Sequence, residues 1–243
     1  MESDEVEHDA LRLNAMDPRL ATIRLHAAVA ASGELRKAGL QLHLVGHLIG
    51  DGRISGSSPR GNGDDAQVAV GVLAQIAADL LEASAALLSG SNHYAGAALL
   101  RQIVEVEYLT WAFANDKREA SGWLNSTHQE RLDFFAPGKL RGISDGHFLA
   151  SDYRHHCEHG GHPVPMAIPL LGNPESPVSQ MLLVDLPLHS WRTTDNLIAW
   201  TGRFPPLESV SEALSNGQHA FARWGETDPL YKWSLTAPPA PLP

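Results

Sequence analysis

The sequence contains a single cysteine, Cys157, among 243 residues. One cysteine cannot form a disulfide within the chain, so a disulfide-stapled scaffold is excluded and a reducing compartment is favoured. Basic residues are also few, because 18 lysines and arginines face 28 aspartates and glutamates, for a formal net charge of −10. A broad electrostatic surface for nucleic acid needs clustered lysine and arginine. The composition excludes such a surface but leaves room for a small pocket that binds one phosphate.

Long apolar runs are missing as well. No window reaches the roughly 18 uninterrupted apolar residues that a membrane-spanning helix needs. The first residues are acidic, whereas a signal peptide begins with basic residues. Hydrophobic residues at 43% and charged residues at 19% are ordinary for a globular protein. We therefore expect a cytoplasmic protein with no membrane partner.

The apolar residues recur mostly with helical spacing, and no series of segments alternates with the two-residue period of strands. The sequence predicts an all-α fold, a helical bundle of four to five principal helices with a long antiparallel helical hairpin and a proline-rich crossing loop. Three parts are expected along the chain. They are an acidic N-terminal segment at 1–17, a single all-helical domain at 18–228, and a proline-rich tail at 229–243 that we expect to be disordered.

Helix caps and breakers set the expected boundaries. Asp64 or Asp65 caps the strongest helix, and Thr127 with Glu130 fits a capping box. The expected helices are 3–16, 18–49, 66–89, 93–115, a short one ending at 124, 127–135, one that carries the histidine-rich stretch to 160, 178–200 and 207–222. The expected loops are 50–65, which is rich in glycine, and 163–177, which is rich in proline.

Several of these boundaries depend on single residues. Pro137 with Gly138 predicts the end of the helix at 127–135. Ser144 or Asp145 is the predicted cap of the following helix. Pro187 predicts a bend or break within 178–200, and a strand at 181–186 is the alternative for that stretch.

The second arm of the hairpin, 93–115, carries polar residues on an otherwise apolar helix. At 100° per residue, Arg101, Glu105 and Tyr108 fall on one stripe of this helix. If the stripe faces inward, Arg101 and Glu105 form a partly buried ion pair. Such a pair contributes little net stability, so it indicates either a group that orients another residue or a structural tie between helices.

The stretch Phe148–His162 is the main candidate for chemistry. It holds four of the 13 histidines, the only cysteine, one arginine and two carboxylates. Imidazole exchanges protons near neutral pH and binds metals. A solvated helix face does not need this composition, and an apolar core would tolerate little of it.

A metal site is one interpretation of this stretch. Residues 155–159 read His-His-Cys-Glu-His, which matches the inverted zinc-protease signature. His155 and His159 lie one helical turn apart, and with His162 they are the candidate metal ligands. Such an enzyme also needs an acidic ligand downstream and a sheet that holds a peptide, and no sheet is predicted. Cys157 as a nucleophile is a further alternative, without an oxyanion-hole motif beside it.

Arg154, the polar His155, three further residues and His159 match the signature of a helical nuclease superfamily. In that family an arginine is followed by a polar residue, often Asn, Asp or His, with a histidine a few residues on. The run Leu-Leu-Arg-Gln-Ile-Val-Glu at 99–105 is also similar to the Arg-x-x-x-Glu helix of related bacterial helical proteins. Over about residues 66–200 the chain therefore resembles the HEPN (higher eukaryotes and prokaryotes nucleotide-binding) superfamily.

This resemblance implies a metal-independent endoribonuclease that cleaves RNA by attack of the 2′-hydroxyl and needs no cofactor. Arg154 would neutralise the scissile phosphate, and His159 would transfer the proton as base or acid. The expected supporting residues are His155, Glu105, Arg101 and Tyr108. The alternative is a catalytically inactive helical dimerisation or interaction module, in which the histidines cap the end of a polar helix.

The resemblance also implies a homodimer in which two Arg/His pairs meet. Helix geometry favours the same arrangement, since five residues place Arg154 and His159 about 140° apart on an ideal helix. A toxin or defence effector would have a cognate inhibitor or antitoxin as a further partner. Toxin members that are modified by a partner nucleotidyltransferase carry a tyrosine two residues after the histidine, where this chain has Gly161. We do not carry over that regulation.

Overall fold

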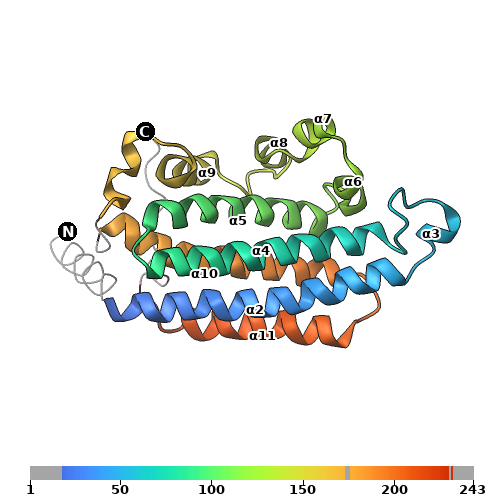
Figure 1. The fold of residues 1–243 in the computed structure, drawn as a ribbon, viewed down its shortest axis with the longest axis horizontal. Helices are drawn as coiled ribbons and strands as arrows, with labels where there is room; N and C mark the ends of the chain where they lie inside the picture. The colour runs from blue at the N-terminus through green and yellow to red at the C-terminus, as the bar shows by residue number, and fades with distance from the viewer. Residues whose placement is uncertain (1–17, 173–175, 230, 232–243) are drawn as a thin grey trace.

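The computed structural model describes residues 18–172, 176–229 and 231, and within them it contains helices and no strand. The predicted all-α fold is therefore confirmed. Five long helices lie side by side, with shorter helices over α5 (Figure 1). The long helices are α2 (Pro18–Leu48), α4 (Asp65–Ser89), α5 (His93–Ala114), α10 (Pro177–Thr201) and α11 (Glu208–Gly225).

Helix α4 begins at a side-chain cap and runs through the centre of the bundle. The Asp64 carboxylate accepts hydrogen bonds from the backbone N–H groups of Ala66 and Gln67. Small residues let α4 approach α2 closely. A Cβ atom added at Gly71 would lie 2.8 Å from the carbonyl oxygen of Gly39. The two glycines therefore set the spacing of α2 and α4, which form the most extensive helix pair of the bundle.

Residues 90–92 connect α4 to α5, and the two helices run in opposite directions (Figure 1). Helix α5 packs against α4 and α10, and the short helices cover its remaining side. Apolar α5 residues such as Leu100 and Ile103 are fully buried in the main core. A second, smaller core around Val104, Tyr108 and Trp111 joins α5 to the segment that precedes the histidine stretch.

The segment 120–142 differs in detail from the prediction. The capping box of Thr127 and Glu130 is present, and it begins α7 (His128–Glu130), which continues as a π-helical turn, η1 (Arg131–Phe135). Pro137 follows that helix and also begins another one. It occupies the first turn of a further helix, α8 (Pro137–Gly142), where proline needs no N–H partner. The remaining short helices here are α6 (Ala120–Asn125) and, in the predicted 50–65 loop, α3 (Gly52–Ser55).

Helix α10 passes through Pro187 and remains one helix from Pro177 to Thr201. The alternative of a strand at 181–186 is wrong. Leu182, Leu183 and Leu186 are buried in the main core. A short apolar run reads equally well as a buried strand or a buried helix segment, and here packing against α5 and α2 selects the helix.

The described part of the C-terminal region is anchored to the bundle. The Arg24 guanidinium is 0% exposed and donates two hydrogen bonds to the Asp228 carboxylate, at 2.6 and 3.0 Å. The Tyr231 ring packs 5.2 Å from the Trp224 ring. The packed chain therefore extends slightly past the expected start of the tail at 229. The predicted acidic segment at 1–17 and residues 232–243 of the predicted tail lie outside the described residues.

Among the described residues, one helix is apolar and long enough to cross a membrane. It is α4, with a mean hydropathy of 1.5 over its most apolar window, and 61% of that window is buried inside the protein. Its apolar side chains pack against α2 and α5, so the bundle core accounts for its composition.

Candidate functional site

The histidine stretch forms α9 (Ala150–His156) and continues as a π-helical turn, η2 (Cys157–Gly161). The helix begins later than predicted, because Leu149 is the N-cap residue and no side chain caps it. Ser144 instead accepts a hydrogen bond from the backbone N–H of Phe148, at 3.2 Å. Turn η2 packs directly on α5. A π-helical turn is uncommon and occurs frequently at functional sites, which directs attention to its residues.

Gly160 explains how closely η2 approaches α5. A Cβ atom at this position would lie 2.5 Å from the backbone carbonyl carbon of Ala97. No side chain fits there without displacing one of the two backbones. The glycine is therefore required by a helix-to-helix contact, beyond any role in ending the helix.

The two predicted catalytic residues have different environments. The Arg154 side chain is exposed and has no hydrogen bond or ion pair with another described residue. His159 is only 6% exposed, and its Nδ1 lies 2.8 Å from the carbonyl oxygen of His155. Within one chain the guanidinium therefore faces solvent while the imidazole packs inward. The structure does not bring them together on one exposed surface.

The hydrogen bond of His159 determines its tautomer. A carbonyl oxygen only accepts, so Nδ1 carries the hydrogen and Nε2 carries the lone pair. Nε2 has no hydrogen-bond partner among the described residues and, unlike Nε2 of His156, it is not fully enclosed. The His155 ring lies 4.1 Å from the His159 ring. Burial, followed by the charge of His159, lowers the pKa of His155.

The candidate metal ligands His155, His159 and His162 are not assembled into a site. His162 is exposed, whereas His159 is buried. Throughout the described ranges, no group of three His, Cys, Asp or Glu side chains converges as metal ligands would. Cys157 is a free, half-buried thiol.

Arg101 and Glu105 form the predicted partly buried ion pair, with 2.8 Å between Nη2 and Oε1. The Tyr153 hydroxyl donates to the same Glu105 oxygen at 2.9 Å. Burial raises the pKa of Tyr153 to about 12, so the hydroxyl keeps its proton. The pair therefore ties α9 to α5 and fixes the orientation of the helix that carries Arg154.

Tyr108 also positions this segment. It is 1% exposed, and its ring stacks on Phe148 with 3.8 Å between centroids. Its hydroxyl is enclosed and has no hydrogen-bond partner in the part of the chain that the structure describes. Burial, followed by the negative charge of Asp152, raises the pKa of Tyr108. Of the predicted supporting residues, Arg101, Glu105 and Tyr108 thus hold the helix in place.

A buried carboxylate–imidazole pair lies beside α9, and the sequence analysis missed it. Nδ1 of His189 on α10 lies 2.5 Å from Oε2 of Glu107 on α5, with both side chains at most 3% exposed. Burial alone would lower the pKa of His189, but the charge and hydrogen bond of Glu107 outweigh it, and the pKa is raised. The pair is a buried ion pair. The one available indication was a second glutamate on an apolar helix, two residues after Glu105.

His156 packs against this pair and is uncharged. Its ring lies 5.0 Å from the His189 ring. Burial, then the charges of His189 and its neighbours, lowers the pKa of His156 to about 2. Its Nε2 lies 3.9 Å from an Asp152 oxygen and forms no hydrogen bond with the described residues. The nearby Asp185 has its pKa raised to about 6 by burial. Neighbouring ionisable side chains therefore extend from α5 through α10 to α9.

A cavity of about 600 Å³, here called the polar cavity, opens between α5, α10 and the start of α9. Charged and aromatic side chains line much of it, among them Glu107, Asp152, Trp191, Arg192, Asp195 and Asn196. One Arg192 nitrogen lies 3.8 Å from Oε1 of Glu107. The buried ion pair therefore borders an open space through its carboxylate.

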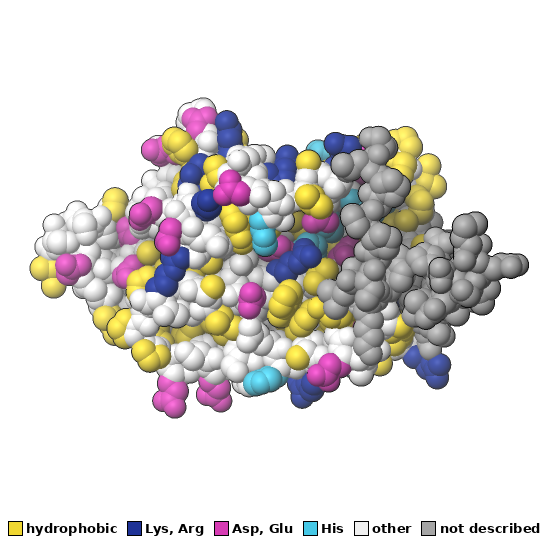
Figure 2. All heavy atoms as spheres, turned by 180° about the vertical axis from the view of Figure 1, so that it is seen from behind, with side chains coloured by type: hydrophobic (Ala, Val, Ile, Leu, Met, Phe, Trp, Pro, Cys, Tyr) yellow, Lys and Arg dark blue, Asp and Glu magenta, His cyan; other side chains and the backbone are white. Residues whose placement is uncertain are grey.

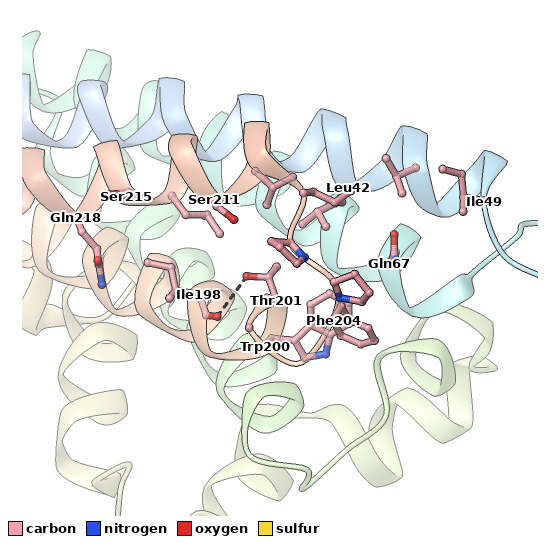
Figure 3. A pocket seen from close by; sticks show the side chains of 17 residues that line it. Leu42, Ile49, Gln67, Ile198, Trp200, Thr201, Phe204, Ser211, Ser215 and Gln218 are labelled. Carbon is pink, nitrogen blue, oxygen red and sulfur yellow. Dashed lines mark hydrogen bonds between the residues drawn. The ribbon is translucent and has the colours of Figure 1, made fainter.

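A larger cavity of about 720 Å³, here called the apolar cavity, lies away from the histidines, between α2, α10 and α11. Figure 3 shows Leu42, Ile198 and Trp200 on its walls, with Phe204 beside Trp200. The Thr201 hydroxyl in its wall donates to the carbonyl oxygen of Ile198, at 3.2 Å. None of the predicted site residues lines this cavity. The larger volume of the apolar cavity is therefore no evidence that the predicted chemistry of α9 takes place there.

Arg141 is a second cation beside α9 that the sequence analysis did not select. Its guanidinium lies over the Tyr153 ring, 5.1 Å from the centroid. Like Arg154, it forms no ion pair with another described residue. Figure 2 shows histidine, arginine and acidic side chains close together near the middle of one face. The site is thus locally mixed in charge, although the chain carries a formal charge of −10.

These features define an all-helical protein with a histidine-rich π-helical turn beside a buried carboxylate–imidazole pair. Comparison with family models, with curated proteins and with solved structures finds no match.

Proposed function

We propose that the chain is a metal-independent endoribonuclease of HEPN type, with Arg154 and His159 as its catalytic residues. One observation carries the proposal. The guanidinium of Arg154, which no described residue pairs with, and the Nδ1-anchored imidazole of His159 lie on one short segment, α9 with η2. A free guanidinium is suited to bind a phosphate. An imidazole with a defined tautomer is suited to transfer a proton at neutral pH.

The proposed reaction uses the RNA as its own nucleophile. Nε2 of one His159 takes the proton of the 2′-hydroxyl, and the 2′-oxygen forms a bond to the adjacent phosphorus. The bond from phosphorus to the 5′-oxygen then breaks, and that oxygen takes the proton which the same His159 imidazole accepted from the 2′-hydroxyl. The products are a 2′,3′-cyclic phosphate and a 5′-hydroxyl. Arg154 stabilises the negative charge that develops on the phosphate oxygens.

In this proposal, a dimer of the chain reconciles the different directions of the Arg154 and His159 side chains. Arg154 faces solvent, and His159 is 6% exposed on the adjoining turn. In a two-fold dimer the same segment of the partner approaches from the opposite side. The arginine of one copy then reaches the phosphate beside the histidine of the other. Arg141, which is unpaired and close to α9, would add a contact to the RNA backbone.

In this proposal the supporting residues position Arg154 through their hydrogen bonds. Glu105 accepts hydrogen bonds from both Arg101 and Tyr153. These bonds fix α9 on α5, and with them the direction of Arg154. A loosened helix would misplace the guanidinium, and small misplacements reduce rates strongly.

The test is digestion of a mixed RNA substrate in the presence of EDTA, with analysis of the product ends. The wild type should cleave and leave cyclic phosphates. Arg154→Ala, at an exposed position, should fold normally and lose about 10²-fold or more of the rate. His159→Gln should also be inactive. The control is His162→Ala, an exposed histidine of the same stretch, which should retain activity.

The burial of His159 favours a second candidate, a catalytically inactive helical interaction module. In that case the wild type leaves the RNA intact, whereas the chain still self-associates. Cleavage that survives Arg154→Ala would also exclude the proposed mechanism. A toxin or defence role, with a cognate inhibitor as partner, follows only if the cleavage is observed.

A further inference from the structure

We propose that the polar cavity binds a small organic cation, a protonated amine attached to an apolar or aromatic body. This site is separate from the nuclease proposal and does not depend on it. Three features of the cavity favour such a ligand: the Glu107 carboxylate at its wall, the balance of charge around it, and its aromatic walls.

The buried carboxylate is that of Glu107. The residue is 2% exposed, and its Oε2 is paired with His189. Its Oε1 forms no hydrogen bond with a described residue and lies 3.8 Å from an Arg192 nitrogen, beyond hydrogen-bond distance. This oxygen is not fully enclosed, and because Glu107 lines the polar cavity it is open to a donor there. An N–H group of a ligand in the cavity would supply the missing hydrogen bond to Oε1 of Glu107.

Negative charge exceeds positive charge on the walls. Glu107, Asp152 and Asp195 line the cavity, and Arg192 is the one lysine or arginine among its lining residues. Protonated His189 balances the charge of Glu107, which leaves Asp152 and Asp195 against Arg192. Within the described residues, Asp152 has no lysine or arginine within 4 Å, and its histidine neighbour, His156, is uncharged. Asp195 is exposed and accepts a hydrogen bond only from the neutral amide of Gln218, at 3.1 Å. A ligand with an ammonium group would neutralise this excess.

Fixed aromatic rings supply a surface for the rest of the ligand. Trp191 stacks on Phe221 with 4.8 Å between centroids, and His147 stacks on Trp111 with 5.2 Å. Trp191 and His147 both line the cavity. Rings that are already packed lose little freedom when they contact a ligand, and indole attracts cations. The volume of about 600 Å³ lies within the usual range for small-molecule sites.

The test is calorimetric titration of the full chain with three compounds that share a phenyl body. The compounds are 2-phenylethylamine, 2-phenylethanol and 3-phenylpropionate, which carry a cation, a neutral hydroxyl and an anion. The amine should bind at least about tenfold more tightly than either of the others. Equal binding of amine and alcohol, tighter binding of the anion, or no binding of the amine would overturn the proposal.

Variants locate the binding within the cavity. Asp152→Asn and Asp195→Asn should each weaken binding of the amine about tenfold. Because Asp195 is exposed, its variant should fold normally, so weaker binding by that variant cannot be explained by misfolding. Ser151→Phe, at an exposed lining position, should block the cavity and abolish binding. Asp145→Asn, which removes an exposed carboxylate paired with Lys117, is the control and should bind normally. Binding that survives both Ser151→Phe and Asp195→Asn would overturn the assignment.

Discussion

At the scale of single residues, the most unusual contact is the buried pair of Glu107 and His189. Removing two charges from water is costly, so such a pair contributes little net stability, whereas loss of one partner leaves the other unsatisfied. The pair joins α5 to α10 beside the polar cavity and holds the Glu107 carboxylate in one orientation. Its charge state should therefore be visible in the stability of the whole protein.

Stability should fall as the pH rises above the ordinary histidine pKa, because His189 has a raised pKa in the folded state. Protonated His189 contributes its full stabilisation below about pH 6.5, and that contribution is lost as pH rises through the folded pKa. Glu107→Gln should remove about 1–3 kcal/mol at about pH 6 and less at about pH 9. Urea unfolding of both proteins at the two pH values measures this difference. An equal loss at both values would show that the pair is not charged.

The contribution of His156 to the unfolding free energy should depend on pH in the opposite direction. Its folded pKa is lowered to about 2, so below about pH 6.5 the unfolded state binds a proton that the folded state does not. This costs up to about 1.4 kcal/mol for each pH unit below that value. His156→Leu should abolish the loss, and at neutral pH it should change stability little, because it also removes an unpaired nitrogen. The measurement is the difference in unfolding free energy between variant and wild type at about pH 7 and about pH 5. A difference that does not change with pH would contradict the prediction.

At the scale of elements, the contact between η2 and α5 determines where the histidines lie. Gly160→Ala would place a Cβ atom 2.5 Å from the Ala97 backbone. We expect a loss of about 1–3 kcal/mol in unfolding free energy, since the overlap involves two backbones and no flexible side chain can move away. Gly142→Ala is the matched control, with nothing within 4 Å of its Cβ position, and it should be neutral or slightly stabilising. Equal effects of the two substitutions would show that η2 does not pack on α5 as described.

The long helices could be predicted because their apolar spacing and their caps are local in sequence. Asp64 at the start of α4 and the capping box of Thr127 are examples. The helix boundaries that were predicted less accurately lie where the same residues fit two different local structures. Pro137 fits both the end of one helix and the first turn of the next, and Pro187 lies among buried residues inside α10, which continues through it.

The candidate site was predictable only where its residues are neighbours in the chain. The Arg154–His159 segment stands out by composition alone. The pair of Glu107 and His189 joins residues 82 positions apart, and only the packing of α5 against α10 brings them together. Burial lowers the pKa of His189, but the charge and hydrogen bond of Glu107 raise it by more, and the order of residues does not reveal this contact.

At the scale of the whole molecule, a net charge of −10 opposes unspecific contact with RNA. A nuclease of this charge must depend on a few placed cations, and Arg154 on α9 and Arg141 beside it form no ion pair with any described residue. One copy of the chain directs Arg154 outward and His159 inward. The proposed active site is therefore a property of two chains, and its composition can be tested without knowing the RNA target.

Mixing two inactive variants should restore activity if each site combines Arg154 of one copy with His159 of the other. Arg154→Ala and His159→Gln homodimers contain no complete site. After random exchange, about half of the dimers are mixed, and each mixed dimer holds one intact site out of two, so about a quarter of wild-type activity should return. The measurement is RNA cleavage before and after the variants are unfolded together and refolded, with each variant refolded alone as the control. If the mixture stays inactive while exchange of subunits is demonstrated, the two residues do not act across a dimer interface. Because η2 holds His159 inward within each chain, that result would remove the nuclease mechanism itself.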